Sequence, residues 1–247
     1  MNLFKSRNKY DAKRQEDALS VIFDQADSFF LGDEMLVANK NTHFLDDPVF
    51  SSLLADLATH PQYSGMAWRL HVLCWAVSLA TQIEGSCIEC GVFRGFKSLF
   101  LLKYFGATLE NRKYYLFDTY EGIDESLSAG SPIGKEEHSK VRLYDFVVDR
   151  FSEFSNVSVV KGSVPRALSE VEVEQVAFLH LDMNSYKAEI GALDALWEKI
   201  PIGGVIVLDD FGLISHRAQM EHELPWLKQR GQDVLEFPTG QGLVVKR

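Results

Sequence analysis

Three aspartates follow two apolar segments in the second half of the chain. Asp182 comes directly after VAFLHL (176–181), and Asp209 and Asp210 follow GGVIVL (203–208), 27 and 28 residues later. If these segments are neighbouring strands, the three carboxylates meet at one edge and raise one another's pKa unless a cation neutralises them. Oxygen ligands of this kind suit Mg²⁺, so the pattern predicts a metal site. The competing interpretation, a helix N-terminus, explains one aspartate more easily than three.

A glycine turn provides a second group of residues with chemical potential. Glu89, Gly91 and Gly95 form ExGxxxG, which begins within the apolar segment CIEC (87–90). Glycine at such a turn lets backbone N–H groups approach a ligand closely. The second glycine of the dinucleotide fingerprint GxGxxG is missing, which counts against a nicotinamide-dependent oxidoreductase. ExGxxxG is common in class I methyltransferases, but a tight turn that needs glycine only for packing explains it as well.

Asp118 ends the next apolar segment, KYYLFD (113–118), 27 residues after Gly91. A carboxylate at this place can accept hydrogen bonds from both ribose hydroxyls of a nucleoside. The alternative is a turn cap in DTYEG, because aspartate readily accepts hydrogen bonds from nearby backbone N–H groups. The preceding glycine turn favours the nucleoside.

The three cysteines, Cys74, Cys87 and Cys90, are too few for a disulfide framework. Cys87 and Cys90 form a CxxC pair, but residues three apart in a strand point to opposite faces. We therefore expect packing rather than redox chemistry. No second Cys/His pair follows with the spacing of a zinc site.

Composition excludes several classes of protein. The 247 residues carry 25 Lys+Arg against 35 Asp+Glu, a net charge of −10, which argues against a nonspecific nucleic-acid binder. The most apolar long stretch, 66–80, contains Arg69 and His71 and is too short to span a membrane. The N-terminus lacks the apolar run of a signal peptide. We expect a soluble cytoplasmic protein with no membrane or nucleic-acid partner.

The hydrophobic pattern predicts how these residues are positioned. Residues 1 to about 60 look helical and mixed, with an apolar stripe that ends in Phe29 and Phe30 and is interrupted by a turn at LGDE (31–34). One helix is expected over about 48–59, and a buried helix follows over about 65–82. Beyond residue 86, strands alternate with helices, which predicts a mostly parallel sheet with helices on both faces. In such sheets, ligands bind beyond the carboxyl ends of the strands. The predicted strands are 87–92, 113–118, 157–162, 176–182 and 203–210, followed by an antiparallel pair in VLEF and GLVVK; the predicted helices run through about 104, over about 140–152, briefly after 162, through about 198 and over about 214–229.

The chain resembles the macrocin O-methyltransferase family of S-adenosylmethionine-dependent enzymes. Five motifs carry the resemblance, in family order, over about 86–247. It implies an α/β, Rossmann-like class I methyltransferase sheet of seven strands, the last one antiparallel, with helices on both faces. We also expect two parts, an N-terminal helical extension (1–62), which carries none of these motifs, and a methyltransferase domain (63–247). The motifs are IECGVFRG (88–95), LFDTYEG (116–122), HLDMNSY (180–186), GGVIVLDDFG (203–212) and PTGQGLVVK (238–246).

The resemblance also implies roles for single residues. Asp182 would take part in catalysis as a metal ligand. Asn184 replaces the second aspartate of the family's usual DxDxY, a candidate general base, and cannot take a proton at neutral pH. His138 in the long loop could act as the general base instead, although the favoured interpretation is a solvated loop histidine without a catalytic role. His180 is expected to be a buried core residue. The implied binding sets are Glu89, Gly91, Asp118 and Ser163 for S-adenosylmethionine, with Ser163 near the adenine, and Asp182, Asp209 and Asp210 for Mg²⁺.

The expected function is Mg²⁺-dependent methyl transfer from S-adenosylmethionine to a hydroxyl of a small molecule, such as a sugar of a natural product. Asn184 keeps open a methyltransferase-fold binding protein without turnover. The loop 121–139 is expected to be a mobile lid. The sequence leaves open the acceptor, the role of the N-terminal residues and the oligomeric state, with a homo-oligomer as one alternative.

Overall fold

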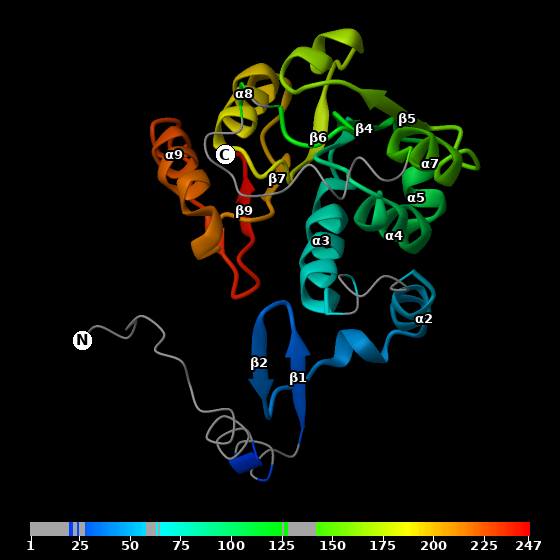
Figure 1. Ribbon diagram of the computed structural model, residues 1–247, viewed down its shortest axis with the longest axis vertical. Helices are drawn as coiled ribbons and strands as arrows, with labels where there is room; N and C mark the ends of the chain where they lie inside the picture. Colours follow the sequence, from blue (N-terminus) through cyan, green and yellow to red (C-terminus); the bar gives the residue numbers. More distant parts are fainter. Residues whose placement is uncertain are drawn as a thin grey trace.

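A seven-stranded sheet forms the centre of the protein (Figure 1). The computed structural model describes residues 20, 21, 24, 28–57, 63, 65–124, 126, 127 and 142–247. The strand order is β5-β4-β3-β6-β7-β9-β8, and β9 pairs antiparallel with both of its neighbours. This confirms the predicted sheet and its antiparallel last strand. The strands are β3 (Ser86–Cys90), β4 (Tyr114–Asp118), β5 (Val157–Lys161), β6 (Val176–Leu181), β7 (Val205–Leu208), β8 (Leu235–Glu236) and β9 (Gly242–Val245).

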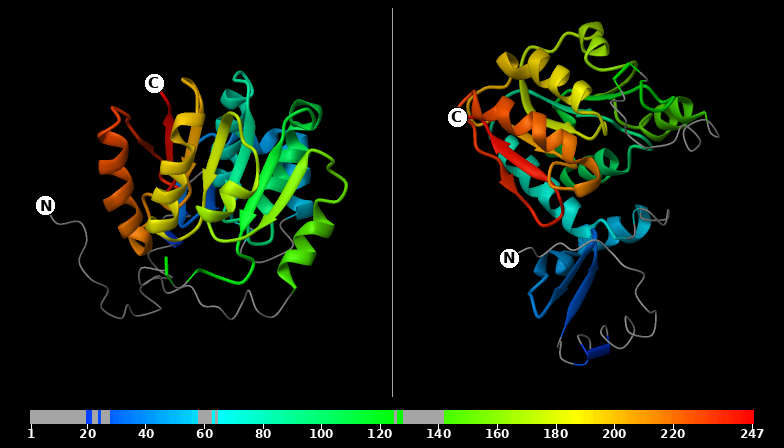
Figure 2. Two further views of the ribbon diagram at one scale, coloured as in Figure 1. Left: turned by 90° about the horizontal axis from the view of Figure 1, so that it is seen from above. Right: turned by 60° about the vertical axis from the view of Figure 1, so that its left-hand side comes forward.

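Helices cover both faces of this sheet (Figure 2). Apolar side chains accordingly form two separate clusters, one on each side. The predicted helices of the second half are present, the short one after 162 and the start of the one over 214–229 as 3₁₀ turns. The α-helices are α2 (Pro48–Leu57), α3 (Ala67–Ala80), α4 (Phe96–Phe105), α5 (Ala107–Glu110), α7 (Leu143–Arg150), α8 (Tyr186–Leu196) and α9 (Arg217–Lys228); the 3₁₀ helices are η1 (His43–Asp46), η3 (Arg166–Glu170), η4 (Trp197–Lys199) and η5 (Ile214–His216).

The cysteine pair serves packing, as expected. Cys87 belongs to one apolar cluster and Cys90 to the other, so the two side chains lie on opposite faces of β3. Both are free thiols. Burial raises the pKa of Cys87 to about 12 and that of Cys90 well above its ordinary value. Neither thiol is therefore available as a nucleophile at neutral pH.

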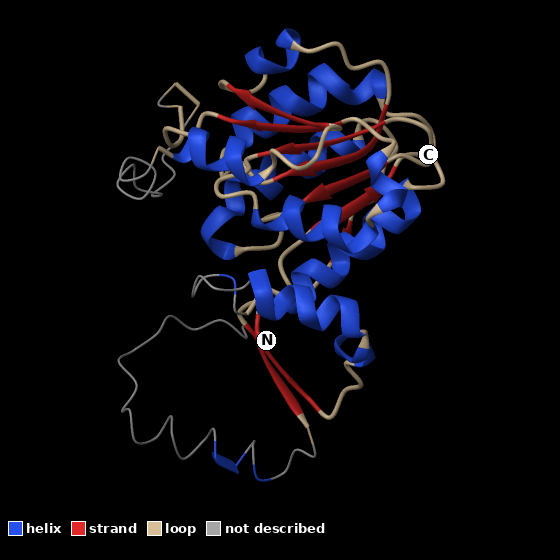
Figure 3. Cartoon of the chain, turned by 90° about the vertical axis from the view of Figure 1, so that its right-hand side faces the viewer, coloured by secondary structure: helices blue, strands red, loops and turns tan. Residues whose placement is uncertain are grey.

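The prediction that the first 60 residues are mainly helical is wrong over 29–38, whereas the turn predicted at 31–34 is present. This segment is an antiparallel hairpin of β1 (Phe29–Gly32) and β2 (Met35–Ala38), which projects away from the main sheet (Figure 3). Its two-residue turn places Asp33 at φ 49° and Glu34 at φ 57°, the left-handed region that tight hairpins require. Apolar residues on either side of a GDE turn therefore pair as strands, while α2 follows near its predicted place.

The hairpin turn is attached to the start of α3. Oδ2 of Asp33 accepts hydrogen bonds from the backbone N–H groups of Trp68 (2.9 Å) and Arg69 (3.1 Å), two donors that the helix itself leaves unpaired. Phe50 of α2 packs edge-on against Phe100 of α4, with ring centroids 5.0 Å apart. The described part of the N-terminal region thus shares the main apolar core.

Helix α3 is largely but not wholly buried. Nine of its 14 residues are buried, yet Trp75 is 47% exposed, so the expectation of burial all round is wrong on that side. Among the described residues, no helix has the length and apolarity needed to cross a membrane.

The turn between β3 and α4 requires glycine for two reasons. Gly91 has φ +90°, and a Cβ there would lie 2.0 Å from the carbonyl oxygen of Asp182. Gly95, at φ +73°, would place a Cβ 2.5 Å from the ring of Phe151. The packing interpretation of the glycine motif therefore holds, and the close approach sets this turn against the end of β6.

We predict that Gly91→Ala lowers the free energy of unfolding by about 2–4 kcal/mol, because strain at positive φ adds to a backbone collision. Gly231→Ala is the matched control, since Gly231 has φ +70° but open space around it, and should cost only about 1 kcal/mol. Urea unfolding of both variants tests this. If both variants lost the same free energy of unfolding, the close contact between residue 91 and Asp182 would not contribute to the effect.

Candidate active site

The sheet register brings the three predicted aspartates together. Strand β6 lies between β3 and β7, and the residues that follow these strands continue the pairing: the N–H of Asp182 donates to Cys90 (2.8 Å) and that of Asp209 to Leu181 (2.9 Å). One carboxylate oxygen each of Asp182, Asp209 and Asp210 lies within 4.8 Å of the others. The convergence predicted from the sequence is therefore present.

Two cations of the protein itself lie among these carboxylates. Lys97 Nζ is 2.5 Å from Oδ2 of Asp182 and 2.5 Å from Oδ2 of Asp209. Arg69 donates from Nη1 to Oδ2 of Asp209 at 2.6 Å and lies 3.7 Å from Asp210. Sequence reasoning missed both partners. The available signal was a Lys or Arg within each of two mostly apolar segments, AWRLHVL (67–73) and FKSLFLL (96–102).

Asp209 is the most constrained of the three. Its Oδ2 accepts from Arg69 and Lys97, and its Oδ1 accepts from Gln241 Nε2 (3.0 Å) and lies 3.2 Å from His180 Nε2. Burial alone would raise the pKa of Asp209, but Arg69, Lys97 and His180 outweigh it and hold this pKa well below its ordinary value. Asp209 is thus a fixed negative charge.

Asp182 and Asp210 have fewer partners and a different charge state. Burial raises the pKa of Asp182 to about 7, in spite of Lys97 beside it. Burial and the charge of Asp209 raise the pKa of Asp210 to about 6. Near neutral pH these two carboxyl groups therefore hold or release protons easily, or bind a further cation.

His180 joins Asp209 to Glu89 and is buried, as expected. Its Nδ1 lies 3.1 Å from Oε1 of Glu89, whose Oε2 accepts from the Ser98 hydroxyl. Burial lowers the pKa of His180, but Asp209 and Glu89 outweigh this and raise it to about 9. The imidazole is therefore protonated at neutral pH and positions two carboxylates.

A first cavity of about 270 Å³ opens beyond the ends of β3, β4, β5 and β6. It is lined by Gly91, Asp118 and Ser163, three of the four residues expected to bind the cofactor, and by Asn184. Glu89, the fourth, does not line it. The cavity is of the size and position expected for a small ligand in a fold of this kind.

Asp118 accepts hydrogen bonds from the turns around it. Oδ2 receives the N–H groups of Val92 (2.7 Å) and Phe93 (2.8 Å), and Oδ1 receives that of Tyr120 (2.7 Å). Asp118 therefore caps the neighbouring turns, as the alternative interpretation predicted. Oδ1 also lies 3.4 Å from the Thr119 hydroxyl, but the single proton of that hydroxyl is directed to the carbonyl oxygen of Gly122. One lone pair of Oδ1 therefore stays available to a ligand hydroxyl.

A second cavity, of about 360 Å³, lies on the other side of the aspartates. Charged groups line it: Glu89, Arg69, Lys97, Asp209 and Asp210, together with Asp33 and Glu34 of the hairpin turn. Phe93 and Asp182 line both cavities. The wall shared by the two cavities is thus where a group could pass between two bound molecules.

Other candidate residues have less to do with the cavities. His138 and most of the loop 121–139 lie outside the described residues. Tyr186 stacks on His222, with centroids 3.7 Å apart, and Phe211 is buried. Neither Tyr186 nor Phe211 lines either cavity.

The seven-stranded sheet, with its antiparallel β9 and helices on both faces, has the α/β, Rossmann-like fold of class I methyltransferases. The chain matches the macrocin-O-methyltransferase (TylF) family over residues 68–229, and it belongs to that family. It is 26% identical over 157 residues to the Streptomyces olivaceus enzyme named 8-demethyl-8-(2,3-dimethoxy-alpha-L-rhamnosyl)-tetracenomycin-C 4'-O-methyltransferase. That match covers 58% of this chain and 59% of the relative, so it spans little more than half of either protein.

Solved structures support the fold. The O-methyltransferase NovP superposes with a TM-score of 0.60 at 16% identity, over 72% of this chain and 79% of that one. The calicheamicin methyltransferase CalS11 gives 0.54 at 15% identity, over 98% and 99%. A Podospora anserina methyltransferase, PaMTH1, solved with bound SAH, gives 0.53 at 10% identity, over 99% and 100%.

We predict that the free energy of unfolding falls by about 2 kcal/mol between pH 6.5 and pH 9 because of His180. The pKa of His180 is near 9 in the folded protein, against an ordinary value of 6.5. A raised pKa contributes stability below pH 6.5 that is lost as the imidazole deprotonates towards pH 9. Urea unfolding at both pH values should show this fall in the wild type and a smaller one in His180→Asn. An equal fall in both proteins would contradict the assignment.

Proposed function

We propose that this protein transfers the methyl group of S-adenosylmethionine to a hydroxyl of a small, sugar-bearing molecule. The observation that carries the proposal is the pair of cavities that meet at Asp182 and Phe93. Methyl transfer needs two ligands held in line across such a boundary. Family membership and the name of the Streptomyces olivaceus relative, whose named substrate carries a rhamnosyl group, favour a glycosyl acceptor.

The first cavity suits the cofactor. Gly91 allows the turn to approach closely, Asp118 Oδ1 has room for a ribose hydroxyl, and Ser163 follows the end of β5 on the side proposed for the adenine. Asp182, on the shared wall, would lie towards the positive sulfonium, which a carboxylate attracts. Glu89 would act at a distance, through Ser98 and His180.

The second cavity suits a hydroxyl-rich acceptor. Its carboxylates can accept hydrogen bonds from sugar hydroxyls, and Arg69 and Lys97 can donate. The hairpin turn contributes Asp33 and Glu34 to this wall, which gives the N-terminal region a part in acceptor binding. Asn184 lines the cofactor cavity and cannot accept the hydroxyl proton.

Asp182, Asp209 and Asp210 would hold Mg²⁺. The donor set fits, because three carboxylate oxygens converge within 4.8 Å and Asp209 is oriented by Arg69, His180 and Gln241. When bound, the ion would lower the pKa of the acceptor hydroxyl and fix its direction. The protein's own residues would orient the acceptor and keep Asp209 ionised.

We predict that Asp118→Ala weakens S-adenosylmethionine binding by about 1.5–3 kcal/mol, because a charge-assisted hydrogen bond to the ribose is lost and the glycine turn loses its acceptor. Isothermal titration calorimetry measures the change. Asp149→Ala, an exposed aspartate on α7, is the control and should bind as the wild type does. Unchanged affinity in Asp118→Ala would remove Asp118 from the cofactor site.

We predict that a chelator abolishes methyl transfer and that Mg²⁺ restores it. Asp210→Asn should prevent the rescue at ordinary Mg²⁺ concentrations and leave S-adenosylmethionine binding nearly intact. Asp210 is the better variant than Asp209, because Asp209 also holds four protein donors. S-adenosylhomocysteine release reports turnover, and Asp149→Asn is the control.

The site should also prefer Mg²⁺ or Mn²⁺ to Zn²⁺, since no Cys or His joins the three carboxylates in this proposal. Full activity in chelator, with no rise in melting temperature on adding Mg²⁺, would overturn the metal assignment. Methyl transfer would then proceed without metal, with Asp182 as the proton acceptor. No S-adenosylmethionine binding at all would overturn the transferase itself.

A further inference from the structure

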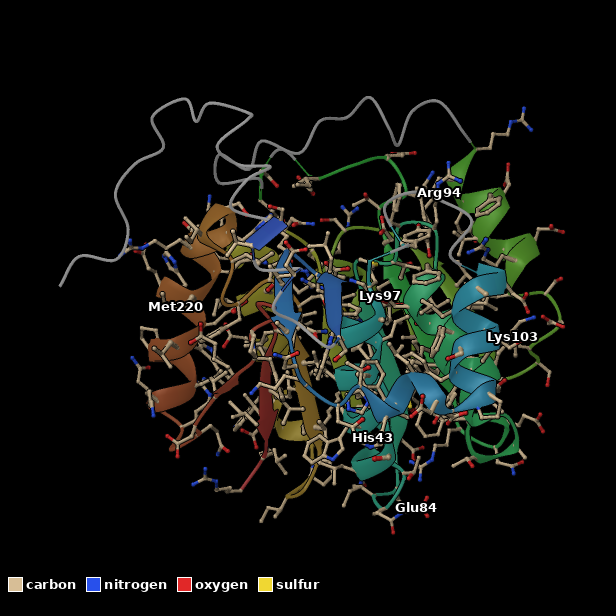
Figure 4. The ribbon with its side chains drawn as sticks, turned by 90° about the horizontal axis from the view of Figure 1, so that it is seen from below. His43, Glu84, Arg94, Lys97, Lys103 and Met220 are labelled. Carbon is tan, nitrogen blue, oxygen red and sulfur yellow. The ribbon has the colours of Figure 1, made fainter. Side chains whose placement is uncertain are left out.

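Lys97 is a buried cation in the middle of the candidate active site. It is the second residue of α4, and only 8% of it is exposed. Figure 4 shows Lys97 within the molecule and Lys103, from the same helix, near its rim. Burying an ammonium group is costly unless carboxylates surround it, so its place is determined by Asp182 and Asp209.

The ammonium group of Lys97 lies between the carboxylates of Asp182 and Asp209. Its nitrogen is 2.5 Å from Oδ2 of Asp182 and 2.5 Å from Oδ2 of Asp209, two of the three groups whose oxygens converge. A Mg²⁺ ion binds oxygens at about 2.0–2.1 Å and needs the same lone pairs. An ammonium group and an ion cannot share that space, and their charges repel each other.

We propose that Lys97 Nζ and a divalent cation are alternative occupants of one position, so that Lys97 sets the affinity of the site for the ion. This rests on the metal site of the proposed function. The side chain has a place to go, because Lys97 lines the second cavity, where Asp33 and Glu34 carry negative charge. Ion binding would therefore move a cation from the carboxylates into the acceptor cavity.

Arg69 does not share this freedom. Its guanidinium donates to the backbone oxygens of Asp209 (2.8 Å) and Thr239 (2.9 Å) as well as to the Asp209 carboxylate. These bonds hold it beside Asp209 whichever cation is present. Lys97 has a flexible four-carbon stem, and its hydrogen bonds within the described part of the chain go to these two carboxylates, so it is the exchangeable partner.

The first test is a Mg²⁺ titration by calorimetry of the wild type, Lys97→Met and Lys103→Met, without S-adenosylmethionine. Removal of a competing cation should tighten Mg²⁺ binding in Lys97→Met by about tenfold or more. Lys103→Met, which removes a half-exposed lysine paired with Glu153 at 3.4 Å, should bind as the wild type does. Equal or weaker binding by Lys97→Met would overturn the proposal while leaving a metal site that the wild type fills.

The second test needs no variant, and so does not depend on Lys97→Met folding. The wild-type protein is treated with an amine-acetylating reagent with and without Mg²⁺, and modified lysines are quantified by mass spectrometry. Acetylation of Lys97 should increase several-fold when Mg²⁺ releases it into the cavity, while Lys103 stays unchanged. Unchanged acetylation of Lys97 under conditions where Mg²⁺ binds would overturn the proposal. Absence of Mg²⁺ binding in both wild type and Lys97→Met would overturn it together with the metal site.

Discussion

The charge of Asp209 is the constraint on which the rest of the structure depends. This carboxylate is 2% exposed and accepts or shares hydrogen bonds with four side chains, Arg69, Lys97, His180 and Gln241. They come from α3, α4, β6 and the segment before β9, so one buried charge ties together elements far apart in the chain. A buried carboxylate is tolerated only when cations and hydrogen-bond donors compensate its charge. Removing one of these partners leaves a buried charge that is not fully compensated.

The same arrangement divides the work among the three aspartates. Asp209 has protein partners on both carboxylate oxygens and stays ionised. Asp182 and Asp210 have fewer partners and raised pKa values, and they line the second cavity, where they can bind a further proton or cation. A site of this kind can hold a proton, an ammonium group or a divalent cation between its carboxylates. The proposed chemistry uses that capacity at Asp182, which stands on the wall between the cofactor and acceptor cavities.

Much of this could be predicted from the sequence, because it follows from local pattern. Continuous apolar runs predict parallel strands buried on both faces, and the carboxyl ends of such strands share an edge. The aspartates after β6 and β7 therefore converge if these strands are neighbours, which they are. Cys87 and Cys90 were separated by the same period-two geometry. These inferences needed no knowledge of distant contacts.

The rest depends on contacts between distant segments. Lys97 and Arg69 reach Asp209 across 112 and 140 residues, and nothing in their own segments indicates that partner. The turn of the hairpin at 29–38 was predicted, but its strands were missed because Phe29 and Phe30 continue a helical stripe as well as they form a strand. Asp118 is another example. Its hydrogen bonds from the N–H groups of Val92 and Phe93 could not be predicted, because they depend on the folded position of a turn 25 residues earlier in the chain.

The most direct test of the account is a crystal structure with S-adenosylhomocysteine and Mn²⁺, whose anomalous signal locates the ion. We predict that the nucleoside lies in the cavity of Asp118 and Ser163, with its sulfur towards Asp182. The Mn²⁺ peak should lie within coordination distance of Asp182, Asp209 and Asp210, with Lys97 turned into the second cavity. A nucleoside bound elsewhere, or Lys97 still between Asp182 and Asp209 with no anomalous peak there, would contradict it.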